Sequence, residues 1–350
     1  MGPLLPELKE NDVVGNKYKV QRKLGEGGFG AVYKVSDTAT KHEYAIKLES
    51  VLAKVQILKM EVLVLEEIDK YLTDRQHNRH FCKIAAKGCE PRKFFFVVMT
   101  LVGPTLYNLK KLMPTEKFTW STALRTGTQS VEAIRDMHAI GYLHRDLKPA
   151  NYCVGNKDYQ EHRIIFLLDF GMCRKYKHRS GKIKTPREAA GFRGTTRYAS
   201  INCHLGWELA RKDDLEALFY QQVELTTKHL PWRLLSDKDE VLQCKEECRT
   251  KAGMKRMLHG CPDQYKEILA YIDEIKYYEA PNYDWIISTL NQALADNGYK
   301  ECDLYDWEIP IDELPKPEET DAPADLNHSP DDRAKGAKHS KNKSRSKKKR

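Results

Sequence analysis

The stretch GYLHRDLKPANY, residues 141–152, contains three polar side chains whose types and spacing could do chemistry: Asp146, Lys148 and Asn151. A carboxylate can accept the proton of an attacking hydroxyl, an ammonium can contact a transferring phosphate, and a carboxamide oxygen can bind magnesium. A solvated turn is the alternative interpretation of any short charged run. The phosphoryl-transfer interpretation therefore requires partner residues elsewhere in the chain.

A second magnesium ligand is predicted in LLDFGM, residues 167–172. Asp169 follows the apolar run IIFLL, and an aspartate at the end of a strand is often only structural. Here Phe170 can anchor the segment and Gly171 can give it flexibility, which an aspartate needs in order to move onto magnesium. We therefore expect Asp169 and Asn151 to bind the metal ion.

The glycine cluster LGEGGFGAV, residues 24–32, matches the pattern G-x-G-x-x-G-x-V. Glycine allows a backbone to approach phosphate groups closely and to form a tight hairpin, although an ordinary glycine-rich turn would fit too. Strand patterns flank the cluster and no helix opens at its last glycine, which excludes the dinucleotide-binding form of the motif. The predicted phosphate-binding loop consists of Leu24, Gly25, Glu26, Gly27, Gly28, Phe29, Gly30, Ala31 and Val32.

Lys47 lies in YAIKLE, a strand pattern that predicts burial. The alternative is a lysine on an edge strand with its ammonium in water. Glu61 argues against that alternative, because it shares the apolar stripe of the next predicted helix with Leu58 and Leu65, where an unpaired carboxylate is costly. We expect Lys47 to pair with Glu61 and to direct its ammonium at the α- and β-phosphates of a nucleotide.

Strand patterns dominate the N-terminal part of the chain. Two alternating strands flank the glycine cluster, YAIKLE follows a polar turn, and a further strand pair is centred on KFFFVVMTL. Between them, VQILKMEVLVLEEIDKYL has the period of a helix. After Gly103 and Pro104 the pattern changes to long helices, one of which Gly141 is expected to end and another of which Asp213 or Asp214 could cap. The predicted fold class is α+β, with a small sheet lobe joined by one hinge to a larger helical lobe.

The composition favours a protein of a reducing compartment. Of 350 residues, 41% are hydrophobic, but no apolar run approaches the roughly 18 residues of a membrane span. We expect neither a secretory signal nor a lipid anchor at the N-terminus. Nine cysteines, an odd number, fit free thiols. A zinc site can be imagined, but no second close pair lies at finger spacing, and we expect no zinc. Its ligands would come from Cys244, Cys248, Cys261 and His259.

The net charge of +9 is unevenly distributed. Residues 309–332 contain eight acidic residues, one lysine and five prolines, whereas residues 333–350 contain ten Lys or Arg and no acidic residue. This composition predicts an acidic, proline-rich disordered linker followed by a basic disordered tail. The tail could be a nuclear address, a contact for microtubules or another polyanion, or a solvated segment. We expect a monomer in the cytoplasm, with the nucleus as the alternative, and no contact with membranes.

Taken in chain order, the glycine loop, the strand lysine, the helix glutamate, the HRD loop and DFG resemble a eukaryotic protein kinase. The resemblance covers residues 14–308. It implies a bilobal protein kinase fold, with an N-lobe at about 14–99, a hinge at 100–103 and a C-lobe at 104–308. It also implies ATP and Mg²⁺ as cofactors.

The same resemblance implies roles for the residues of the HRD loop. Asp146 would be the catalytic base and Lys148 would contact the γ-phosphate. A lysine at this position is the serine/threonine-kinase form, so we expect transfer from ATP to protein Ser or Thr. A catalytically weak pseudokinase scaffold is the alternative, although pseudokinases typically lack the strand lysine, the HRD aspartate or the DFG aspartate.

The segment GFRGTTRYASINCHLG, residues 191–206, stands where most kinases carry A-P-E. Its Ser-Ile-Asn form is similar to the casein kinase 1 group, as are LVGPTL, DDLEAL and LPWR. KMEVLVL, AGFRGTTRYASIN, NYDW and YDWE resemble the tau-tubulin kinase branch of that group. Kinases of this kind generally need no phosphate on the activation segment, so we expect activity without phosphorylation of Ser180 or Thr185.

Adenine contacts are also implied by the resemblance. Met99 would be the gatekeeper and residues 100–102, with Leu101 at their centre, would form the hinge that binds adenine. Val32 and Ala45 would cover the ring from above, and Cys153 would lie beneath it. Asp214 would anchor the catalytic loop from its long helix.

The segment of residues 172–197 contains nine Lys or Arg and a single acidic residue, Glu188. A solvated basic loop is one interpretation. The other is a site for acidic or already phosphorylated substrates, in which Arg197 contacts an anion with help from Arg193 and Lys238. Arg197 matches the anion-site arginine of the resembled group by position. The resembled group usually has a second lysine at its anion site. Here Lys238 lies between Asp237 and Asp239, which departs from that pattern.

Overall fold

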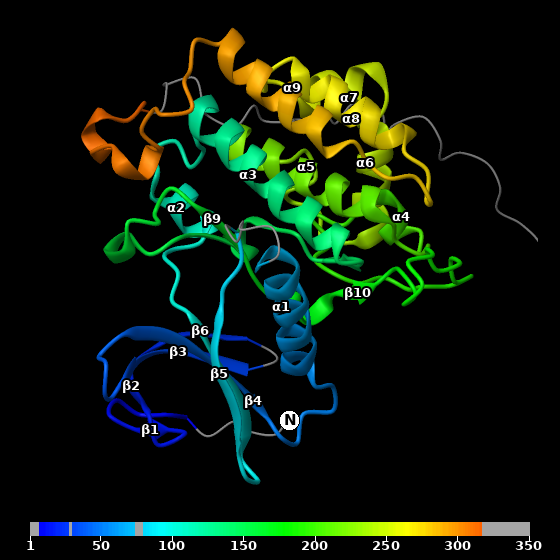
Figure 1. Ribbon diagram of the computed structural model, residues 1–350. Helices are drawn as coiled ribbons and strands as arrows, with labels where there is room; N and C mark the ends of the chain where they lie inside the picture. Colours follow the sequence, from blue (N-terminus) through cyan, green and yellow to red (C-terminus); the bar gives the residue numbers. More distant parts are fainter. Residues whose placement is uncertain (1–6, 28–29, 74–79, 317–350) are drawn as a thin grey trace, which may run out of the picture. The chain divides into compact units, whose positions relative to one another are not determined.

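The computed structural model describes residues 7–27, 30–73 and 80–316 (Figure 1). The chain forms a smaller lobe around one antiparallel sheet and a larger helical lobe, which confirms the predicted α+β architecture. The predicted residues Gly28 and Phe29 of the glycine loop, most of the acidic linker and all of the basic tail lie outside the described residues.

The sheet of the smaller lobe has the strand order β1-β2-β3-β4-β6-β5. Alternating apolar residues drive its formation, since strand β3 buries every second side chain against the core. Its register pairs Val32 with Lys47 and Ala45 with Met99, which brings four predicted site residues to adjacent positions. The strands are β1 (Val13–Val14), β2 (Tyr18–Gly27), β3 (Gly30–Asp37), β4 (Glu43–Ser50), β5 (Ile84–Glu90) and β6 (Phe94–Thr100).

Helix α1 (Ile57–Thr73) packs against β4, β5 and β6 and lies between the sheet and the helical lobe in Figure 1. Its first turn is fixed by Glu49, whose carboxylate accepts hydrogen bonds from the backbone N–H groups of Ile57 and Leu58 at 2.8 and 3.2 Å. A carboxylate at this end also complements the helix dipole. The helix thereby turns its buried face, which includes Glu61, towards Lys47.

The larger lobe is built on helices whose apolar faces form one continuous core. Helix α3 ends at Ala139. Gly141 lies two residues further on with φ +90°, so it ends the helix as the sequence predicted. The helices are α2 (Leu106–Leu112), α3 (Trp120–Ala139), α4 (Ile201–His204), α5 (Arg211–Thr227), α6 (Lys238–Glu247), α7 (Lys251–Met257), α8 (Gln264–Glu274) and α9 (Tyr283–Asp296).

Two short antiparallel sheets of two strands each hold the loops that contain the predicted site residues. One pairs β7 with β10 and the other pairs β8 with β9, so that residues 144–151 and 168–173 emerge side by side. The short elements are β7 (Tyr142–Leu143), η1 (Pro149–Asn151), β8 (Tyr152–Val154), η2 (Lys157–Tyr159), β9 (Ile165–Leu167), η3 (Phe170–Met172), β10 (Arg174–Lys175), η4 (Asp306–Glu308) and η5 (Ile311–Glu313).

The ordered fold continues beyond residue 308, where the sequence analysis placed the start of the linker. Leu314 is buried in the core of the larger lobe. Just before it, the Asp306 carboxylate accepts hydrogen bonds from the hydroxyls of Thr119 and Thr122 at 2.6 and 2.8 Å, which ties this segment to the start of α3. The apolar residues among the prolines therefore extend the kinase-like unit by one short helical turn, η5.

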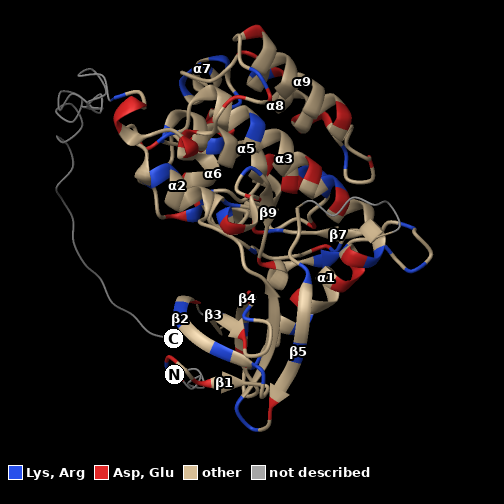
Figure 2. Ribbon diagram, turned by 60° about the vertical axis from the view of Figure 1, so that its left-hand side comes forward, with Lys and Arg blue, Asp and Glu red and all other residues tan. Residues whose placement is uncertain are grey.

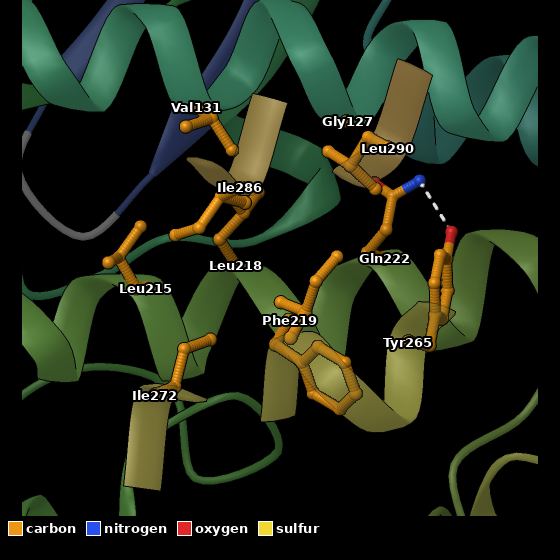
Figure 3. A pocket seen from close by; sticks show the side chains of 11 residues that line it. Gly127, Val131, Leu215, Leu218, Phe219, Gln222, Tyr265, Ile272, Ile286 and Leu290 are labelled. Atoms are coloured by element: carbon orange, nitrogen blue, oxygen red, sulfur yellow. Dashed lines mark hydrogen bonds between the residues drawn. The ribbon is translucent and has the colours of Figure 1, made fainter. Parts of the chain in front are cut away.

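A small internal cavity lies among α3, α5, α8 and α9 and is drawn in Figure 3. Its walls are apolar apart from Gln222, whose amide nitrogen donates to the Tyr265 hydroxyl at 3.1 Å. The cavity measures about 20 Å³, which is the size of one water molecule. It is a packing gap in the core and is too small for an organic ligand.

Candidate active site

Asp214 on α5 fixes the backbone of the HRD loop. Its carboxylate accepts hydrogen bonds from the N–H groups of His144 and Arg145 at 2.7 and 2.8 Å, and it lies 2.9 Å from Nε2 of His138. Burial would raise the pKa of Asp214, but these partners, His138 foremost, hold the pKa below its ordinary value. An ionised anchor can therefore hold Arg145 in its left-handed conformation, φ +69°. Helix α5 is capped by the neighbouring Asp213, which accepts from the Ala210 N–H at 2.6 Å.

The Asp146 carboxylate is bracketed by two donors. Lys148 Nζ lies 2.7 Å from one oxygen, and the Thr195 hydroxyl lies 2.7 Å from the other. Lys148 also donates to the Thr195 oxygen at 3.2 Å. The carboxylate is thus held in one orientation with a cation beside it, which suits a group that accepts a proton next to a phosphate.

Asn151 and Asp169 supply the oxygen ligands expected at a magnesium site. The Asn151 side-chain N–H donates to the backbone carbonyl of Asp146 at 2.8 Å, which leaves its carboxamide oxygen for a ligand. Burial would raise the pKa of Asp169, but the nearby charges of Lys47 and Lys148 keep it below the ordinary value, so the carboxylate is ionised. One carboxylate and one carboxamide oxygen fit Mg²⁺, which prefers oxygen ligands and keeps several waters.

Lys47 and Glu61 form the expected ion pair, with Nζ 2.5 Å from the glutamate oxygen. Nζ also lies 3.5 Å from Asp169. Burial would lower the pKa of Lys47, but the two carboxylates outweigh burial and raise it, so the ammonium is charged. Close approach of α1 to the DFG segment requires Gly171, because a Cβ there would lie 1.9 Å from the Ile57 side chain.

The described glycines of the glycine loop differ in whether they have room for a side chain. A Cβ on Gly30 would lie 2.0 Å from the Leu48 carbonyl oxygen, so this glycine is required for packing within the sheet. Gly25 and Gly27 face open space, where a Cβ would meet no atom within 4 Å. These two positions are where a ligand could approach the backbone closely. Leu24, Glu26 and their glycine neighbours on β2 are exposed.

Four of the residues expected around adenine lie together in one apolar cluster of the hinge region. Ala45, Met99 and Leu101 are buried within it, and Val32 packs against it half-buried. Ala31, next to Val32, points to the opposite side of the sheet and is buried in the core of the smaller lobe. Cys153 on β8 is buried, and burial raises the pKa of its thiol to about 12.

The three residues expected to bind anions are only partly brought together. Arg197 is half-exposed and pairs with the buried Glu224 at 3.1 Å. It lines a depression of about 300 Å³ together with Lys148, Thr195 and Tyr107. Lys238 lies over the ring of Phe192 at 4.1 Å and does not line this depression, and Arg193, the residue after Phe192 in the chain, is exposed. Figure 2 shows basic residues along the loops beside β7.

Two groups at this site were missed by the sequence analysis. Thr195 was quoted within a motif but not singled out, although it contacts both Asp146 and Lys148. Glu208 pairs with Arg174 at 3.1 Å and with Arg187, and so joins two distant parts of the basic segment. The sequence signal for Glu208 was weak, because one acidic residue after a basic run has no defined partner until the chain folds.

The described part of the chain offers neither a cluster of metal ligands nor a membrane-spanning helix. It contains no group of three or more His, Cys, Asp or Glu side chains arranged to hold a metal ion, which gives the zinc interpretation no support. None of its helices combines the length and the apolar character that a membrane crossing needs.

Comparison with known proteins identifies similar chains. Residues 18–277 match the family model described as the protein kinase domain. A relative from Dictyostelium discoideum, named as a serine/threonine-protein kinase with the qualifier probable, is 32% identical over 85% of this chain and 57% of its own length. A second, from Caenorhabditis elegans and named as a putative serine/threonine-protein kinase, is 36% identical over 86% of this chain and 84% of its own length. The C. elegans serine/threonine-protein kinase spe-6 is 32% identical over 85% and 77%. This chain thus spans little more than half of the Dictyostelium relative.

Proposed function

The chain belongs to the protein kinase family and is a serine/threonine protein kinase, and we propose that it phosphorylates acidic or already phosphorylated segments of proteins. The observation that carries this proposal is the position of Arg197, half-exposed in the same depression as Lys148 and Thr195. An anionic group of the substrate bound to Arg197 would hold a nearby hydroxyl beside Asp146. Glu224 already pairs with Arg197, so the anion would have to share the guanidinium, which has five N–H donors.

The chemistry follows from the orientation of the side chains. Asp146 accepts the proton of the attacking substrate hydroxyl, and Lys148 contacts the γ-phosphoryl group of ATP as it moves. Lys47, held by Glu61, binds the α- and β-phosphates. Mg²⁺, when bound to Asn151 and Asp169, neutralises phosphate charge.

Membership of the casein kinase 1 group, and of its tau-tubulin kinase branch, is part of the same proposal. Its support is the sequence GFRGTTRYASIN in place of A-P-E. Gly194 in this stretch has φ +103°, and a Cβ there would lie 2.5 Å from the Arg145 carbonyl oxygen, so the HRD loop and this motif are fitted to each other. The pseudokinase alternative gains no support, since Lys47, Asp146 and Asp169 are all present.

Peptide phosphorylation tests the substrate proposal. We expect lower KM values for peptides with acidic residues or an upstream phosphoserine than for a matched neutral peptide. Arg197→Gln should remove about tenfold of that preference, whereas Arg179→Gln, an exposed arginine of the same basic segment, should not. Added salt should weaken phosphorylation of the acidic peptide more than that of the neutral one. An equal effect on both peptides would overturn the proposal.

The basic tail, residues 333–350, is proposed as a contact for a polyanion, including microtubules, or as a nuclear address in a protein otherwise located in the cytoplasm. Its ten Lys or Arg support this. Deletion of the tail should lower polyanion binding or nuclear accumulation. If polyanion binding and localisation do not change, the tail is a solvated segment and the proposal is wrong.

A further inference from the structure

Lys245 on α6 is fully buried, which is rare for a lysine. Its ammonium has three protons, and three acceptors lie within hydrogen-bond distance: the carbonyl oxygens of Thr196 and Ala199, at 3.0 and 2.5 Å, and Nε2 of His204, at 3.1 Å. The rings of Tyr220 and Trp232 lie 4.9 and 5.2 Å away. When the neutral His204 ring carries its proton on Nδ1, Nε2 accepts, and every donor of this buried cation then has an acceptor.

The two carbonyl acceptors belong to the segment that lines the depression beside Asp146. The carbonyls of Thr196 and Ala199 flank Arg197, whose own carbonyl accepts a hydrogen bond from the Trp232 indole N–H at 2.8 Å. Thr195, which directly precedes Thr196, contacts Asp146 and Lys148. Side chains of the helical lobe thus hold the backbone of residues 196–199, while the side chains of Arg197 and Tyr198 line the depression together with Thr195 and Lys148.

We propose that Lys245 is a positioning residue for substrate binding, because its ammonium holds the segment of residues 195–199 in the conformation that presents Thr195 and Arg197 to the substrate. The inference rests on the proposed substrate site, but it concerns the conformation of that segment and not its preference for anions. It predicts a weaker fit for every peptide substrate when Lys245 is changed, whatever the charge of the peptide.

Burial disfavours the charged form of Lys245. The proposal therefore predicts that KM for peptides depends on pH. Burial lowers the pKa of Lys245 to about 7, despite the opposing charge of Glu216. Deprotonation would remove one of three donors and leave one acceptor unpaired. The other titratable or charged groups that face Lys245 are His204 and Cys203 on α4, Glu216 and Tyr220 on α5, and Cys244 and Arg249 on or beside α6.

The test compares Lys245→Met with Lys255→Met, which removes an exposed lysine of the neighbouring helix α7. Initial rates are measured with an acidic and a neutral peptide and with ATP varied separately. Lys245→Met should raise KM for both peptides about tenfold and leave KM for ATP within about twofold, as expected for lost positioning of one substrate. Lys255→Met should match the wild type.

A folded Lys245→Met variant with unchanged KM for both peptides would overturn the proposal. So would an equal loss for peptide and ATP, since that result describes general destabilisation. Equal KM values of the wild type for the acidic and the neutral peptide would instead count against the anion site and leave the role of Lys245 intact.

A second measurement needs no variant and covers the case in which Lys245→Met does not fold. The KM of the wild type for a peptide with Asp and Glu but no phosphate is followed from pH 6.5 to 8.5, a range in which these carboxylates stay ionised. It should rise about fivefold with a midpoint near 7, the size expected for one hydrogen bond. A flat profile would contradict the lowered pKa of Lys245 and the pH dependence expected from it, whereas unchanged KM values for folded Lys245→Met overturn the positioning role itself.

Discussion

Asp146 accepts a hydrogen bond of 2.7 Å from the hydroxyl of Thr195, a residue 49 positions later in the chain. This bond joins the catalytic loop to the segment that lines the substrate depression. In the proposed mechanism the base is therefore oriented by the same segment that presents Arg197, so substrate binding and proton transfer would share one structural support.

Replacement of Thr195 by Val should lower kcat/KM for peptides about tenfold, because Asp146 loses the donor that fixes one of its oxygens. KM for ATP should not change. The matched control is Thr196→Val, since the contact of Thr196 with Lys245 uses its backbone carbonyl and survives the substitution. Equal kinetics for the two variants would show that the Thr195 hydroxyl does not orient the base.

The Lys47–Glu61 pair is expected to matter for both stability and ATP binding. Glu61→Gln leaves Lys47 with Asp169 alone at 3.5 Å. We expect a loss of about 3 kcal/mol in the free energy of unfolding and a kcat/KM for ATP lower by about a hundredfold. Urea denaturation and steady-state kinetics measure the two effects. Glu66→Gln, which removes an exposed carboxylate of the same helix, is the control, and a similar loss there would contradict the assignment.

Activity without phosphorylation is expected from the position of Glu208. This buried carboxylate pairs with Arg174 and Arg187 and so holds the basic segment with a charge of the chain itself. Phosphatase-treated protein should retain full activity, and Thr185→Ala should too. Glu208→Gln should lower activity about tenfold, whereas the exposed Glu188→Gln should not. A strict need for phosphate at Ser180 or Thr185 would refute this account.

The stability of the protein should depend on pH through Lys245. Its folded pKa of about 7 lies below the unfolded value near 10.5. Between these values the unfolded chain binds the extra proton, so the free energy of unfolding rises with pH by up to about 1.4 kcal/mol per unit. Lys245→Met lacks this contribution. The wild type should therefore gain stability relative to the variant from pH 7 to 9, and parallel curves would contradict the lowered pKa.

Thiol labelling should distinguish Cys153 from the exposed cysteines. Because burial raises the pKa of Cys153 to about 12, it is a neutral thiol at pH 7 and reacts slowly. Cys89 and Cys302 are exposed and should be modified first. If Cys153 lies beneath adenine, saturating ATP should slow its labelling further. Labelling of Cys153 as fast as Cys89, or no protection by ATP, would count against its place in the nucleotide site.

Sequence reasoning reached those features whose physical causes are local. The pairing of Lys47 with Glu61 followed from a carboxylate on an apolar helix stripe, and the two-lobed architecture followed from a change in hydrophobic period. Thr195, Glu208 and Lys245 contact partners that lie 21 to 49 residues away in the chain. Irregular loops bring these partners together, and no sequence pattern predicts the path of such loops. Residues 309–314 were assigned to a linker because Pro310, Asp312 and Glu313 interrupt the apolar residues, of which Leu314 is buried in the core and Ile309 packs against it.

The measurement that tests the central claim most directly is transfer of labelled phosphate from magnesium ATP to casein and to an acidic peptide, with wild type and Asp146→Asn compared. Circular dichroism and ATP binding establish that both proteins are folded. We expect transfer by the wild type and at least about a hundredfold less by the variant, with ATP affinity unchanged. No transfer by folded wild type, or equal transfer by both proteins, would contradict the assignment of Asp146 as catalytic base.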